Sequence, residues 1–243
     1  MRDGEVVRLE DGRPREALVD ELLRVASERP VAVGLDFAFS MPAWVFARTG
    51  FDAAPELWAL AAGRGERWLA GPRWPFWRTR RPDDLPDEWR RTEREIAAAA
   101  PGRRPSSVFK LVGADQVGAG SVRGMALLPR LRGGGIAVWP FDDPVPGASV
   151  AVEIWPRLCY REPVAKSRPA ARADYLARHH PALPESLRAR AERSDDAFDA
   201  LAAAAAMWAH RAALAALPPA RDAVERLEGR IWAPPTTRAA PGG

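Results

Sequence analysis

Cysteine, histidine and lysine are all scarce in this chain of 243 residues. Cys159 is the single cysteine, which excludes an internal disulfide and any zinc site built from several cysteines, and agrees with a reducing compartment. With three histidines, a His-rich metal site is not expected. Lys110 and Lys166 are the two lysines, so arginine carries nearly all of the positive charge.

The sequence also lacks an apolar run long and uncharged enough to span a membrane. Its first residues, MRDGEVVRLEDG, carry no signal or transit pattern. We therefore expect a cytoplasmic protein with no membrane partner. The formal net charge of +4 permits nucleic-acid binding, but enrichment in Arg, Ala, Pro and Gly also follows from a GC-rich genome.

Hydrophobic residues make up 47% of the chain, which is enough for a sizeable core. We predict a single domain over residues 1–235, with an insertion at 71–107 and a disordered tail over 236–243. The insertion opens on GPRWPFWRTRRPDDLP, which is too rich in Pro, Arg and Trp to be regular structure.

This opening stretch has two interpretations. Arg73, Arg78 and Arg80 are interleaved with aromatic residues such as Trp77, which suits phosphate contacts and base stacking on single-stranded nucleic acid. A loop whose tryptophans anchor it to the core, with its arginines in solvent, explains the pattern equally well.

Periodicity predicts an alternation of helices and strands, and hence an α/β fold. Strands are expected over residues 5–10, 31–35, 136–143 and 150–154. Helices are expected over residues 15–28, 42–70 with breaks at Gly50 and Gly63, 87–100, 121–131 and 194–210.

The last of these helices begins with an unusual set of acids. Ser194 is a good N-cap, and Asp195 and Asp196 lie where the helix dipole favours negative charge. Asp199 has no such explanation, because it lies one turn further on, where the helix becomes apolar. A carboxylate that enters a buried face needs a partner, and a cation held between Asp196 and Asp199 is one solution.

Two earlier acids accompany strands. Asp36 ends the strand at 31–35, and open α/β sheets bind ligands at the carboxyl ends of their strands. Capping of a turn is the other use for Asp36, although Ser40 is better placed to cap the following helix. Glu153 lies within the strand at 150–154, where a lone acid commonly faces water. An all-oxygen cluster of such acids suits Mg²⁺ or Mn²⁺, and two such ions support phosphodiester hydrolysis.

Glycine is frequent before the helix expected at 121–131. Gly113, Gly118 and Gly120 resemble a phosphate cradle, but their spacing matches neither the P-loop nor the dinucleotide fingerprint. Close packing of the helix start is an equally good use for them.

The stretches VGLDFAFSMP, SVFKLVGADQVGAGSVRGMALLPRL, IAVWPFD, VAVEIWPRL, SDDAFDALAAAAAM and EGRIWAP, in this order, resemble the predicted RNase H-like nucleases, the family called domain of unknown function 429. The resemblance covers essentially the whole chain. It implies a mixed sheet flanked by helices, with Asp36, Glu153, Asp196 and Asp199 as ligands of two divalent ions. Lys166 and the arginines of residues 73–81 are then candidate contacts for substrate phosphate.

In one respect the sequence differs from this family. Members usually begin with a strand that carries Gly-x-Asp, whose Asp is the central metal ligand, and no such strand is recognisable here. We expect that an upstream start codon would restore it, which the upstream DNA can test.

The resulting prediction is an RNase H-like domain whose full-length form, with the first strand, is a divalent-metal-dependent nuclease. The alternative is a non-catalytic nucleic-acid-binding or regulatory module on the same fold. A nucleotide-binding role, as in the sugar-kinase and actin relatives of the fold, ranks last because their phosphate motifs are missing.

Overall fold

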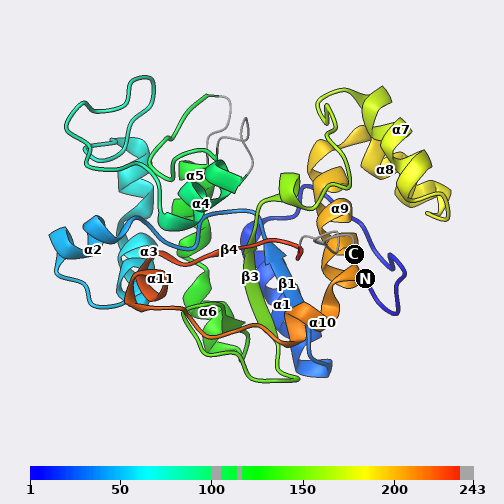
Figure 1. The fold of residues 1–243 in the computed structure, drawn as a ribbon, viewed down its shortest axis with the longest axis horizontal. Helices are drawn as coiled ribbons and strands as arrows, with labels where there is room; N and C mark the ends of the chain where they lie inside the picture. The colour runs from blue at the N-terminus through cyan, green and yellow to red at the C-terminus, as the bar shows by residue number, and fades with distance from the viewer. Residues whose placement is uncertain (100–104, 114–116, 236–243) are drawn as a thin grey trace, which may run out of the picture. The chain divides into compact units, whose positions relative to one another are not determined.

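The computed structural model describes residues 1–99, 105–113 and 117–235. The chain divides into two compact units (Figure 1). The larger comprises residues 16–153 and 218–231, and the smaller comprises residues 1–15, 154–217 and 232–243. The tail predicted at 236–243 lies outside the described residues.

A small sheet forms the centre of the larger unit. Strands β1 (Ala32–Leu35) and β2 (Ala137–Val138) both run parallel to β3 (Val150–Ile154), which lies between them. The short strand β4 (Ile231–Trp232) also pairs with β3. Strand β3 is apolar along most of its length because it is covered on both faces, as is typical of parallel sheets.

Helices surround this sheet. In the larger unit they are α1 (Arg15–Glu28), α2 (Ala43–Thr49), α3 (Ala54–Ala70), α4 (Arg91–Ala99), α5 (Gly118–Met125), α6 (Leu128–Gly133) and α11 (Ala223–Glu228). Helix α3 packs against α5, where Gly65 allows a close approach: a Cβ there would lie 2.8 Å from Val122 Cγ1. This part of the molecule is therefore a mixed α/β structure with a small, open, mostly parallel sheet flanked by helices.

Several predicted boundaries are confirmed and others are wrong. Helix α1 has the predicted bounds, and α2 ends at Gly50, whose φ of 73° provides the left-handed C-cap. Helix α3 continues through Gly63 without a break, since packing against α5 and α6 outweighs the low propensity of glycine. The helix predicted from residue 87 begins instead at Arg91.

The irregular stretch at 71–86 contains no helix or strand among its residues, as predicted. Its aromatic side chains hold it in place: Phe76 and Trp77 are buried, and Trp77 exchanges backbone hydrogen bonds with Phe109 and Leu111. Trp74 packs against Trp44, with ring centroids 5.3 Å apart. The loop is thus anchored to the core by its aromatic residues.

The smaller unit is helical. It contains a 3-10 turn, η1 (Pro156–Leu158), and helices α7 (Pro169–His179), α8 (Glu185–Arg193), α9 (Asp195–Ala209) and α10 (Arg211–Ala215). Its core is built around Tyr175, Leu176, Phe198 and Leu201. The strand predicted at 5–10 is wrong, because this segment joins no sheet in the described part of the chain and instead buries Leu9 against the same core. No helix among the described residues has both the length and the apolarity needed to cross a membrane.

Candidate functional site

The carboxyl end of β1 places Asp36 beside β3. In the parallel register Leu35 pairs with Glu153, so Asp36 is the next residue after that pair. The Asp36 side chain is exposed, and Glu153 is buried with 2% of its surface exposed. The two predicted ligands therefore lie on neighbouring strands at the same edge, the edge at which open α/β sheets bind ligands.

The segment that follows Asp36 is fixed by bonds to four distant residues. The N–H of Ala38 donates to Ser121 Oγ, and the N–H of Phe39 donates to Glu153 Oε2, both at 2.9 Å. The Phe39 carbonyl accepts from Trp58 Nε1 at 2.8 Å, and the Ser40 hydroxyl donates to the Leu227 carbonyl. Asp36 is consequently presented on a rigid support.

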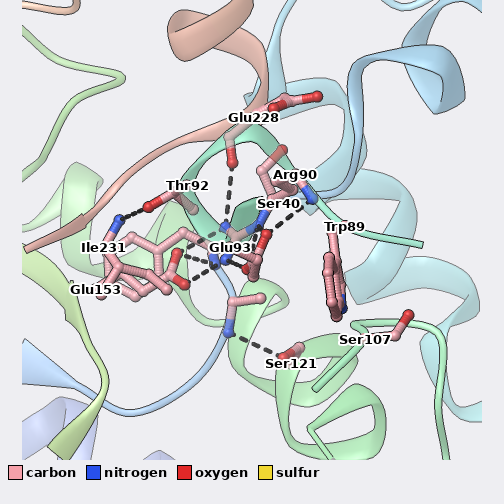
Figure 2. Close-up of polar contacts among 12 residues, drawn as sticks. Ser40, Trp89, Arg90, Thr92, Glu93, Ser107, Ser121, Glu153, Glu228 and Ile231 are labelled. Atoms are coloured by element: carbon pink, nitrogen blue, oxygen red, sulfur yellow. Dashed lines mark hydrogen bonds and ion pairs between the residues drawn. The ribbon is translucent and has the colours of Figure 1, made fainter. Parts of the chain in front are cut away.

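Glu153 faces a buried arginine, as Figure 2 shows. Arg90 Nη1 lies 2.8 Å from Glu153 Oε2, and Nη2 lies 2.5 Å from Oε1, so the ion pair is bidentate. Arg90 is only 1% exposed. A bidentate pair of this kind fixes both the position and the plane of the carboxylate.

The five N–H donors of Arg90 are all used. Besides the two bonds to Glu153, Nε donates to Glu93 Oε1 at 2.9 Å, Nη2 donates to the same carboxylate, and Nη1 donates to the Glu228 carbonyl at 3.1 Å. The guanidinium is thus shared between two buried carboxylates and one carbonyl (Figure 2).

The carboxylate of Glu228 has a different role. It accepts from the N–H of Ala43 at 2.7 Å and from the N–H of Arg91 at 2.5 Å, which are the first residues of α2 and α4. A negative charge at two helix N-termini is favourable, because both present unpaired N–H groups. Glu228 therefore ties α11 to the starts of two other helices.

The charges in this cluster influence one another. Burial raises the pKa of Glu153, and the charge and hydrogen bonds of Arg90 act in the opposite direction. Burial alone would lower the pKa of Arg90, but Glu153 and Glu93 outweigh it, so the pKa of Arg90 is raised. The positive charge of Arg90 is accordingly secure at every ordinary pH.

In the smaller unit, Asp199 has two partners of its own. Tyr160 donates its hydroxyl to Asp199 Oδ1, and Lys166 donates Nζ to Oδ2. Burial raises the pKa of Asp199, against the effect of the hydrogen bonds from Lys166 and Tyr160. The loop carrying Lys166 is held by Arg172, a buried side chain that donates to the Lys166 carbonyl.

Helix α9 begins as its sequence predicts. Ser194 is the N-cap and accepts from the N–H of Ala197 at 3.2 Å. Asp195 and Asp196 are exposed in the first turn, while Asp199 is 6% exposed on the buried face. The helix dipole thus accounts for the first two acids and leaves Asp199 as the one that needs a partner.

The candidate phosphate-binding residues are placed differently from one another. Arg73, Arg78 and Arg80 are exposed, whereas Trp77 is buried next to Phe109. Lys166 is engaged with Asp199. As placed, Trp77 anchors the loop and its ring is not open to a stacked base.

The glycine-rich stretch is used for packing at its described end. Gly118 is the first residue of α5, and a Cβ there would lie 2.5 Å from the Val108 carbonyl oxygen. Residues 114–116 of the suggested phosphate cradle lie outside the described residues.

The bonds that the four predicted acids already make bear on whether they can hold a divalent ion. Glu153 and Asp199 already have both carboxylate oxygens bonded to side chains of the chain itself. In the part of the chain that the structure describes, no group of three or more His, Cys, Asp or Glu side chains could hold a metal ion. As these side chains are placed, Glu153 and Asp199 do not fit a divalent ion, and the ligand assignment of Asp36, Glu153, Asp196 and Asp199 stays a prediction.

The fold and these clusters define an α/β protein with buried, internally paired carboxylates. Residues 2–223 match the family model described as protein of unknown function (DUF429), so the chain belongs to that family. A search of curated proteins and a search of solved structures each find no significant match.

Sequence reasoning missed three residues of the buried cluster. Arg90 and Glu93 lie within the stretch 87–100, which is predicted only as a helix, and Glu228 lies in the stretch EGRIWAP, to which no site is assigned. The spacing of Arg90 and Glu93 is a detectable signal of an ion pair, but only the fold brings Glu153 and Glu228 to it.

Proposed function

We propose that the chain is a nucleic-acid-binding module on an RNase H-like fold that does not rely on a bound divalent metal. One observation carries the proposal: the loop at 71–86 is anchored by buried aromatic residues and presents Arg73, Arg78 and Arg80 to solvent.

The charges of these arginines are available to a polyanion. Arg78 donates to the carbonyls of Leu69 and Ala70, and within the described residues neither Arg73 nor Arg78 has a carboxylate partner. Arg80 pairs with Asp83, but both side chains are more than 80% exposed, so the pair is weak and exchanges readily. Because Trp77 is buried, the contact would be to phosphate and independent of base sequence.

Binding is tested by fluorescence anisotropy with a labelled single-stranded oligonucleotide over a range of salt concentrations. We expect affinity to fall with salt and to fall further in the triple variant Arg73→Ala, Arg78→Ala, Arg80→Ala. Each phosphate contact on a single strand contributes about 0.7 to the salt slope, so three losses reduce it by about 2.

The matched control removes the same charge elsewhere. Arg24, Arg130 and Arg226 are surface arginines paired with acids, and their triple alanine variant should bind like the wild type. If the loop variant also binds like the wild type, the proposal is wrong.

The metal-dependent nuclease is the second candidate. It is favoured by the position of Asp36, which is exposed at the carboxyl edge of β1 on a rigid support. Cleavage of the oligonucleotide in Mn²⁺ that is lost in Asp36→Asn would select it. Salt-dependent binding without cleavage, unchanged in Asp36→Asn, supports the binding module.

A further inference from the structure

We infer that Arg90 and Lys166 take the place of metal ions at Glu153 and Asp199, so that the chain itself supplies the cation for each buried carboxylate. A buried ionised carboxylate is costly unless it is paired and hydrogen-bonded. This inference goes beyond nucleic-acid binding, because it concerns how the two acids are held whatever the chain binds.

At Glu153 any second cation would lie next to the guanidinium that is already bound. One oxygen accepts from Arg90 Nη2, and the other accepts from Nη1 and from the Phe39 N–H. A metal ion bound to either oxygen would have to displace a guanidinium or lie against it, and two positive charges in a buried site repel strongly. Since the other donors of Arg90 are bound by Glu93 and the Glu228 carbonyl, the guanidinium is not free to move aside.

At Asp199 the same role falls to Lys166. Its ammonium donates to one carboxylate oxygen, and the Tyr160 hydroxyl donates to the other. The position of Lys166 is built into the fold, because the buried Arg172 side chain holds the Lys166 carbonyl and the Glu192 carbonyl together. Each carboxylate therefore has one cation and one further hydrogen-bond donor from the chain.

NMR of the full-length chain with Mn²⁺ tests the inference without nucleic acid, so its outcome is independent of the binding proposal. Bound Mn²⁺ broadens amide signals close to it, and Mg²⁺ serves as the diamagnetic reference. The probes are the amides of Phe39, which bonds to Glu153, and of Asp199. We expect no broadening at either amide that depends on the Glu153 or Asp199 carboxylate.

The substitutions Glu153→Gln and Asp199→Asn decide the result. Broadening at Phe39 that Glu153→Gln abolishes, or at Asp199 that Asp199→Asn abolishes, would overturn the inference. Broadening that survives them comes from exposed acids such as Asp36 and Asp196 and agrees with it. Should Glu153→Gln fail to fold, the wild type and Asp36→Asn decide at Glu153: no broadening of the Phe39 amide in the wild type supports the inference, and broadening that persists in Asp36→Asn overturns it.

Discussion

Glu153 and Asp199 are two buried acids that the chain neutralises in different ways. Glu153 is paired with an arginine that is itself 1% exposed and that uses all five donors. Asp199 is paired with a lysine whose side chain is 29% exposed, and its other oxygen accepts from a tyrosine. One pair is closed to solvent on every side, while the other has a cation at the surface.

This difference indicates a structural role for the closed Arg90–Glu153 pair, whereas the more open Lys166–Asp199 pair is compatible with a role in binding. A planar guanidinium with five fixed donors suits a closed site, where every polar group must be satisfied. An ammonium on a flexible stem, with donors left over at the surface, can exchange its partner for a ligand. The Asp199 pair is therefore the better candidate for a group that responds to a bound anion.

The largest expected effect comes from breaking the closed pair. Arg90→Met leaves Glu93 and Glu153 buried without a cation, so we expect the free energy of unfolding to fall by about 3–5 kcal/mol, as for other broken buried pairs. Chemical denaturation at neutral pH measures this.

Arg94→Met is the matched control, since Arg94 lies four residues after Arg90, within α4, and pairs with Asp87 at the surface. It should cost at most about 1 kcal/mol, which is typical of exposed pairs. Equal losses of unfolding free energy in the two variants would show that the buried Arg90 pair contributes no more to stability than an exposed pair.

A smaller effect is expected at the open pair. Lys166→Met should lower the free energy of unfolding by about 1–2 kcal/mol, because Asp199 loses a charged donor but keeps Tyr160 and some access to water. Lys166→Arg retains the charge and should lose less. Non-additivity sharpens the test: once Asp199→Asn has removed the negative charge, Lys166→Met should cost less than it does in the wild type.

Periodicity and capping could predict the local elements of this fold. Helix α9 has its predicted cap at Ser194, and α1 and β3 have their predicted bounds, because each is determined by residues close in sequence. The strand at 5–10 failed for the opposite reason: its alternation is real, but no neighbouring strand pairs with it among the described residues. A strand is defined by its partner, which periodicity does not identify.

The candidate site was predictable only in part. Asp199 could be recognised as a buried acid in need of a cation, because the apolar run of α9 surrounds it. That the cation is Lys166 could not be read from the sequence, since 33 residues separate the two. The same holds for Glu153 and Arg90, which are 63 residues apart. Charge balance in a buried site is a property of the tertiary structure.

The region beside Asp199 contains a histidine that extends the comparison to pH. Tyr160, which donates to Asp199, packs against Tyr175 with ring centroids 6.1 Å apart. Tyr175 in turn packs against His180, also at 6.1 Å. The pKa of His180 therefore depends on the solvent access and charge of the core that supports the Lys166–Asp199 pair.

The smallest expected effect is at His180. Burial lowers its pKa, and electrostatic interactions with Arg161, His179 and Arg188 lower it further. The protonated ring is thus less favourable in the folded chain than in the unfolded chain. Its contribution to stability is fully present above the ordinary pKa of histidine and is lost as the pH falls towards the lowered pKa.

We therefore expect His180→Gln to lose less stability than the wild type between neutral and mildly acidic pH, with His210→Gln as control. If the free energies of unfolding of the wild type and His180→Gln change in parallel with pH, the pKa of His180 is the same in the folded and the unfolded chain, and the prediction is wrong.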